Sequence, residues 1–119
     1  MKYALLIYGN DTEWESRSEE EKQAIYGEYM QVSESPGVFG GSELQPGDTA
    51  TTVRSQNGET LTTDGPFAET KEQLAGYYLI EVESLDDALE WAAKIPSARI
   101  GTIEVRPVVP SRVEVEAAG

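Results

Sequence analysis

The sequence contains no histidine and no cysteine. Without an imidazole, Ser-His-Asp catalysis and the common zinc sites are excluded. Without thiols, disulfides, thiolate metal sites and cysteine nucleophiles are excluded as well. Any proton transfer would fall to Asp, Glu, Lys or Tyr, with an arginine as an electrostatic clamp. We therefore expect no metal and no cofactor.

Basic residues are scarce too, because 9 lysines and arginines face 22 aspartates and glutamates, for a formal net charge of -13. Such an acidic surface repels phosphate backbones, so we expect no nucleic-acid partner. No apolar run approaches the length of a bilayer span, which argues against a membrane protein. No secretory hydrophobic region follows Met1, and with the missing cysteines this favours a cytoplasmic location.

The length of 119 residues is that of one domain. Residues 2–9 (KYALLIYG) and 74–84 (LAGYYLIEVES) are apolar at both alternating sets of positions. Strands with two apolar faces are buried on both sides, so both are expected to be central and adjacent. Residues 38–48 and 100–108 predict two further strands, the first interrupted by a glycine pair and ended by a Pro-Gly turn.

Two helices are expected between these strands. Ser18, followed by Glu21, fits a capping box before the first helix, which Pro36-Gly37 ends. Ser84 caps the second helix, residues 85–95, which ends at a proline. The expected buried stripes are Ile25, Tyr29 and Val32 in the first helix and Leu85, Ala88, Leu89, Ala92 and Ile95 in the second.

Asn57-Gly58 lies between two segments rich in β-branched residues and predicts a hairpin with a type I′ turn. In a two-residue loop, Arg54 stands opposite Leu61 and Val53 opposite Thr62. The whole order predicts an α+β, ferredoxin-like (split βαβ) domain over residues 1–108 with an inserted hairpin, followed by a polar tail, 109–119.

Two helices can cover only one face of such a sheet. We expect apolar positions such as Leu5, Ile7, Tyr77 and Leu79 on the other face. A patch of this size is larger than soluble monomers usually expose, so a second subunit packing sheet to sheet is the simplest cover. The sequence therefore predicts a homodimer.

The segments KYALLIYG, GGSELQP, TATTVR, TDGPFAETKEQLAGYYLIEV, LEWAAKIP and IEVRPV together resemble the DGPF-type members of the YCII-related family. The resemblance spans nearly the whole chain, and its most specific phrase is residues 63–72. It implies a dimeric α+β barrel built from ferredoxin-like subunits. Shorter relatives are suspected of chemistry that uses a histidine and an aspartate, but this histidine-free chain cannot use that pair. Other relatives are linked to sigma-factor-like regulators.

Residues 62–74 hold most of the candidate site residues. Asp64 either orients or deprotonates a ligand, or accepts backbone N–H groups of its own turn. Gly65 and Pro66 shape the turn, and Phe67 is expected to be a buried plug rather than a substrate platform. Glu69 and Lys71 form either a charged pair at the site or an ordinary solvated face.

Two candidates lie outside this segment. Arg54 on the hairpin is placed to clamp an anionic ligand or to form an ion pair with Asp64 or Glu69. Tyr8, at the end of the first strand, either donates a hydrogen bond to a ligand or only packs.

These residues predict a small-molecule enzyme or ligand-binding protein with a cleft at the dimer interface, edged by the DGPF motif. In this hypothesis Asp64 and Arg54 are the catalytic candidates, and the other six residues bind the ligand. The alternative is a non-enzymatic dimeric module that supports a regulator or another protein partner.

Overall fold

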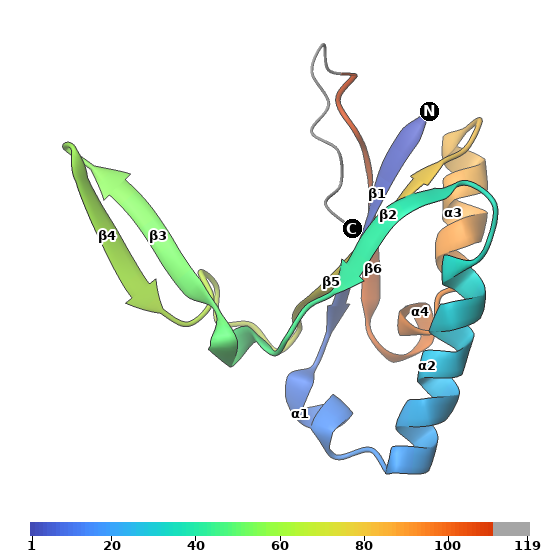
Figure 1. Cartoon of the computed structure of the whole chain (residues 1–119), viewed down its shortest axis with the longest axis horizontal. Coiled ribbons are helices and arrows are strands. Elements are labelled where there is room, and N and C mark those ends of the chain that lie inside the picture. Colours follow the sequence, from blue (N-terminus) through green and yellow to red (C-terminus); the bar gives the residue numbers. More distant parts are fainter. Residues whose placement is uncertain (111–119) are drawn as a thin grey trace.

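The computed structural model of the protein describes residues 1–110. A four-stranded antiparallel sheet has the strand order β2-β5-β1-β6 and carries its helices on one face (Figure 1). The elements of this body are β1 (Lys2–Gly9), α1 (Asp11–Glu15), α2 (Glu19–Ser33), β2 (Val38–Glu43), β5 (Gln73–Glu81), α3 (Leu85–Ala93), α4 (Ser97–Ile100) and β6 (Thr102–Pro107). The two strands that are apolar on both faces, β1 and β5, are central, and the expected ferredoxin-like α+β fold is confirmed.

The two long helices begin where their caps were expected. The Ser18 hydroxyl accepts the Glu21 N–H at 3.1 Å at the start of α2, and the Ser84 hydroxyl accepts the Asp87 N–H at 3.2 Å at the start of α3. Each cap satisfies an N–H group that has no partner within the helix. The short helix α1 was not expected from the sequence.

The core lies between the helices and the sheet. Its buried apolar residues are Tyr3, Leu5, Ile7, Val32, Tyr78, Ile80, Ala88, Ala92 and Ile95. In α3, Ala88 and Ala92 are buried against the sheet, while Leu85 and Leu89 are each about half exposed. Including these two leucines in the buried stripe was therefore wrong, because the small side chains bring α3 close to the sheet and leave the leucines at its sides.

The register between the central strands decides which residues face the helices. Leu5 pairs with Tyr78 and lies on the covered face, whereas Leu6 pairs with Tyr77 and Ala4 with Leu79 on the uncovered face. The expectation that Leu5 and Ile7 lie on the uncovered face was therefore wrong. β1 is apolar on both faces, so its alternation alone could not say which set the helices cover.

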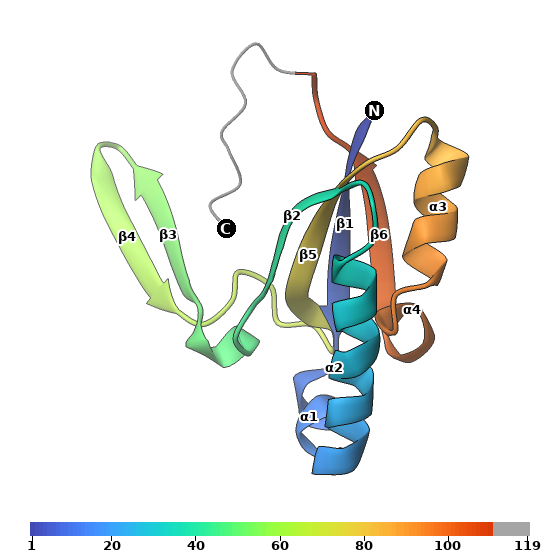
Figure 2. The same cartoon turned by 45° about the vertical axis from the view of Figure 1, so that its right-hand side comes forward.

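Between β2 and β5 the chain forms the 3-10 turn η1 (Gly47–Thr49) and the hairpin of β3 (Thr51–Gln56) and β4 (Glu59–Asp64), which we call the arm. The arm extends from the sheet on the side away from the helices (Figure 2). Its register pairs Val53 with Thr62 and Arg54 with Leu61, as predicted. The turn has φ 50° at Asn57 and 79° at Gly58, which confirms the type I′ geometry.

Most of the expected tail, residues 111–119, lies outside the described residues. Within residues 1–110, no helix combines the length and the apolar composition that a bilayer crossing requires.

Candidate functional site

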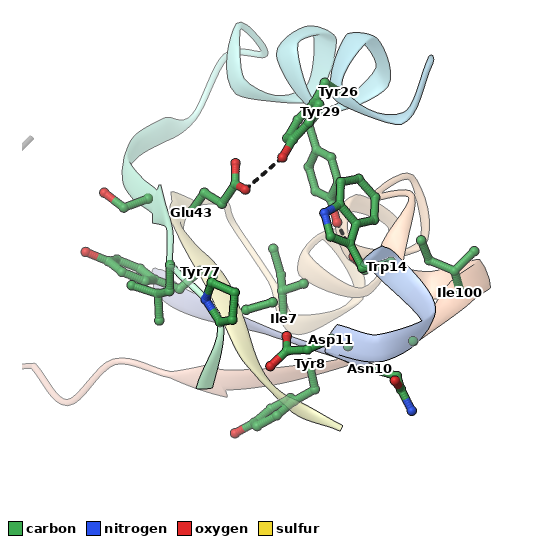
Figure 3. A pocket seen from close by; sticks show the side chains of 18 of the residues that line it. Ile7, Tyr8, Asn10, Asp11, Trp14, Tyr26, Tyr29, Glu43, Tyr77 and Ile100 are labelled. Atoms are coloured by element: carbon green, nitrogen blue, oxygen red, sulfur yellow. Dashed lines mark hydrogen bonds between the residues drawn. The ribbon is translucent and has the colours of Figure 1, made fainter. Parts of the chain in front are cut away.

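A recess lies where β1 ends, and we call it the main pocket. It has a volume of about 850 Å³ and is lined by β1, α1, α2, α4 and the adjoining ends of β2 and β5. Figure 3 shows Asp11 and Trp14 of α1 and Glu43 at the end of β2 around one space, whereas Asn10 points away from it. A recess of this size and mixed polarity is typical of small-molecule sites.

Local hydrogen bonds place Asp11 at the pocket. The Asn10 side chain caps α1 by accepting the Glu13 N–H at 2.9 Å, so the chain turns into α1 directly after β1. The Asp11 Oδ2 atom accepts the Gly47 N–H at 3.0 Å, which ties α1 to η1. The Asp11 side chain thereby becomes a fixed carboxylate on the wall of the pocket.

A second carboxylate comes from the end of β2. The Tyr26 hydroxyl of α2 donates to Glu43 Oε1 at 3.0 Å. The Tyr26 ring meets the Trp14 ring edge to face, with centroids 5.4 Å apart and planes at 83°. One side of the pocket therefore combines two aromatic rings with a carboxylate whose position is set by a phenol.

The inner wall carries hydroxyl groups that are paired with one another. Tyr29 is hydrogen-bonded to Ser97, and the Tyr78 and Ser33 hydroxyls are 2.9 Å apart. Burial raises the pKa of the Tyr29 phenol above its usual value. These groups are neutral and already satisfied, so this wall closes the pocket rather than offering an acid or a base.

The rim of the main pocket is acidic. Its ionisable side chains are Asp11, Glu13, Glu15, Glu43, Arg17 and the tyrosines. Arg17 forms an ion pair with Glu21 on α2, with 3.5 Å between Nη1 and Oε2. Burial, together with the hydrogen bond to Glu43 and the negative charge of that residue, raises the pKa of Tyr26. The phenol therefore stays a hydrogen-bond donor to Glu43 at neutral pH.

Three of the eight residues predicted from the sequence border a second, shallower recess of about 560 Å³, which we call the motif groove. Tyr8, Pro66 and Phe67 line it, and Tyr8 also lines the main pocket, so the two recesses adjoin. Gly65 lies beside them with φ 99°, a value that favours glycine. Its N–H donates to Ala50 O at 2.7 Å, which anchors the motif to the base of the arm.

Phe67 was expected to be a buried plug, and this was wrong for the described chain, because its side chain is 76% exposed. Its ring instead contacts Arg54, with the guanidinium carbon 5.0 Å from the ring centroid. Arg54 thus lies against Phe67 and forms no ion pair with Asp64 or Glu69. The contact brings two predicted site residues together on the side of the arm.

The remaining predicted residues do not converge. Asp64, Glu69 and Lys71 are exposed, and none of them lines the main pocket or the motif groove. Among residues 1–110, no N–H donates to the Asp64 carboxylate, so the expected alternative of a turn cap is not observed. The loop that carries Glu69 and Lys71 is held by Gln73, whose Nε2 donates to Ala68 O and Thr70 O at 3.0 Å each.

Sequence reasoning missed the residues that do converge, namely Asp11, Trp14, Tyr26 and Glu43. One signal was present, because Asn10-Asp11 directly follows a central strand, where polar side chains often serve a site. No pattern connected this position with Glu43, which lies 32 residues later in the sequence and reaches the pocket at the end of β2.

Two comparisons with known proteins agree with each other. The family model of the YCII-related domain matches residues 1–112. A protein of Rhizobium meliloti (strain 1021) named "Uncharacterized protein R00369" is 40% identical over 117 residues, which cover 91% of this chain and 92% of that protein. The predicted resemblance is confirmed at the level of the family, and the chain belongs to the YCII-related family.

Proposed function

We propose that the protein binds a small organic molecule in the main pocket. The observation that carries this proposal is the convergence of two fixed carboxylates, Asp11 and Glu43, with the Trp14 and Tyr26 rings around one recess of about 850 Å³. An apolar recess with a few oriented polar groups is the usual form of a ligand site. If a reaction occurs there, Asp11 and Glu43 are the carboxylates that hydrogen bonds hold in position for proton transfer.

The residues of the DGPF motif enter this proposal at its edge. Because Tyr8 borders both recesses, a ligand longer than the main pocket would extend along Pro66 and Phe67. Arg54 and Asp64 on the arm, and Glu69 and Lys71 in the loop that follows it, would reach such a ligand only in the cleft of an assembled dimer. We propose a role for these four residues only in that dimer cleft.

We further propose that two copies associate through the uncovered sheet face. Leu6, Tyr77 and Leu79 on this face are only partly buried, and Phe67, in the segment that returns from the arm to β5, is 76% exposed. A patch formed by these side chains would be covered by the same face of a second copy. The second candidate function, a dimeric module for another protein partner, rests on this apolar surface alone.

Tryptophan fluorescence tests the ligand proposal, because the chain has two tryptophans and only Trp14 lines the main pocket. Trp91 packs on Tyr78 in the core, with centroids 6.1 Å apart. In the Trp91→Phe variant, Trp14 is the only indole, and binding of a molecule from a fragment library is expected to change its emission. In the matched Trp14→Phe variant, the same molecule should leave the emission of Trp91 unchanged. Equal responses of both variants, or no response to any fragment, would contradict the proposal.

A further inference from the structure

Two of the carboxylates that line the main pocket, Glu43 and Asp11, each have one oxygen engaged by the protein. Glu43 Oε1 accepts the Tyr26 hydroxyl, and Asp11 Oδ2 accepts the Gly47 N–H. Within residues 1–110, no hydrogen bond or ion pair engages Glu43 Oε2 or Asp11 Oδ1. A carboxylate that is held by one oxygen and offers the other is prepared to accept a hydrogen bond from a ligand.

The aromatic pair next to Glu43 favours the same kind of ligand. Ring faces of Trp and Tyr attract cations. The Lys22 ammonium, which is not part of the lining, already lies 6.0 Å from the Trp14 centroid. This indole therefore already contacts a cation, whose charge is balanced by Glu15 and Glu19 at 4.0 Å each. A ligand ammonium would have to approach the ring pair from the pocket, where it would gain the Glu43 carboxylate in addition.

The charge around the pocket acts in the same direction. Carboxylates outnumber basic side chains in the lining, and the one guanidinium, from Arg17, is paired with Glu21. The protein as a whole carries a formal charge of -13. Such a field concentrates cations and repels anions at a recess. A metal ion would need a shell of oxygen or nitrogen ligands, whereas much of this wall is aromatic and apolar.

We propose that the ligand of the main pocket is an organic cation, an amine that is protonated at neutral pH, with its ammonium group at Glu43 against the Trp14 and Tyr26 rings. This inference rests on the proposed ligand function of the same pocket. Asp11 provides the second carboxylate, for a further N–H or O–H donor of the ligand. The inner wall of paired hydroxyls accommodates the uncharged part of the molecule.

Three probes of nearly equal size separate charge from shape, namely benzylamine, benzyl alcohol and benzoate. Binding is followed by two-dimensional NMR of the 15N-labelled full chain, with Asn10, Trp14 and Glu43 amides as reporters of the main pocket. Benzylamine is expected to bind there about tenfold more tightly than benzyl alcohol, as one charge-assisted contact and one cation–π contact imply. Benzoate is expected to bind more weakly than both.

Two variants assign the preference to a residue. Glu43→Gln keeps an acceptor for Tyr26 but removes the charge, and it should reduce the preference for benzylamine over benzyl alcohol to within about twofold. The matched control Glu59→Gln lies at the tip of the arm, makes the same chemical change and should leave the preference intact.

Each outcome of the titration decides between the two proposals. If benzyl alcohol binds the reporters as tightly as benzylamine, or benzoate binds more tightly, the cation proposal is overturned while the ligand pocket stands. If Glu43→Gln keeps the full preference, Glu43 is not the cation site and the proposal is likewise overturned. If none of the three probes moves the reporter amides, both the pocket and its specificity are contradicted.

Discussion

In the body, Leu5, Ile80 and Ile95 are completely buried, whereas in the arm every residue of β4 and all but one of β3 are exposed. The body therefore folds around its own core, as hydrophobic burial requires. A two-stranded hairpin without such a core is at best marginally stable in water. The arm depends on its turn, on the hydrogen bonds at its base and, in our proposal, on a second copy. This difference also separates the main pocket from the exposed side chains of the DGPF motif.

The largest effect is expected when equivalent leucines of the two regions are shortened. Leu5→Ala leaves a cavity in the core and should lower the free energy of unfolding by about 2–5 kcal/mol. Leu61→Ala in the arm, at a side chain that is 44% exposed, should cost less than about 1 kcal/mol. Urea unfolding of both variants measures the contrast. If both variants lost the same free energy of unfolding, the arm would share a core with the body, and the contrast between the two regions would be wrong.

The next effect concerns the uncovered sheet face. Leu79→Asp places a charge on this face and should weaken the proposed association of two copies by more than about a hundredfold, because the carboxylate would be buried without a partner. Leu89→Asp, on the exposed side of α3, is the matched control and should leave the proposed association unchanged. Sedimentation equilibrium gives both constants. A wild-type protein that is monomeric at micromolar concentration would refute the proposed homodimer.

A smaller and local effect is expected at the turn of the arm. Gly58 has φ 79° and open space around the position of a Cβ atom, so a side chain there meets backbone strain but no clash. In Gly58→Val, backbone strain of about 1–2 kcal/mol should destabilise the closed hairpin, so the open form of the arm should be populated roughly tenfold more. Hydrogen exchange should show faster exchange of the arm amides and unchanged amides in β1 and β5.

Gly58→Asn serves as the control, since asparagine tolerates positive φ. If Gly58→Val leaves the exchange of the arm unchanged, the turn does not hold the arm together. If it accelerates exchange in the central strands as well, the arm and the body are one cooperative unit.

The smallest effect is the contribution of Tyr26 to the pH dependence of stability. Its pKa in the folded protein is raised by burial and by Glu43, so the neutral phenol is the favoured form. This contribution is fully present below the unfolded pKa of about 10 and is lost as the pH rises through the folded pKa. The stability difference between the wild type and Tyr26→Phe should therefore shrink in alkaline solution. Urea unfolding of both proteins from about pH 8 to 11 measures this difference. If the difference in free energy of unfolding stays constant over that range, the interaction of Tyr26 with Glu43 is disproved.

The fold could largely be predicted from the sequence because its signals are local. Ser18 and Ser84 mark helix starts, Asn57-Gly58 marks the turn, and the two strands that are apolar on both faces are central. The predictions that were wrong concerned features that depend on long-range packing. Whether Leu5 or Leu6 faces the helices follows from strand register, which an apolar run on both faces does not encode.

The main pocket, which we propose as the ligand site, was not predicted, for a related reason. The DGPF segment drew attention because its polar residues are adjacent in sequence, yet Asp64, Glu69 and Lys71 are exposed and separate from the main pocket. The main pocket is assembled from residues that lie far apart along the chain, such as Asp11 and Glu43. These residues come together only because α1, α2 and β2 meet at the end of β1. No pattern in the sequence indicates that these elements meet.

The most direct test of the central claim, that the ligand site lies in the body rather than on the arm, is a crystal structure of the full chain soaked in a mixture of small-molecule fragments. The account predicts ligand density in the main pocket, in contact with Trp14 and Glu43. Density confined to the Arg54–Phe67 side of the arm, with the main pocket empty, would contradict it and return the site to the DGPF motif.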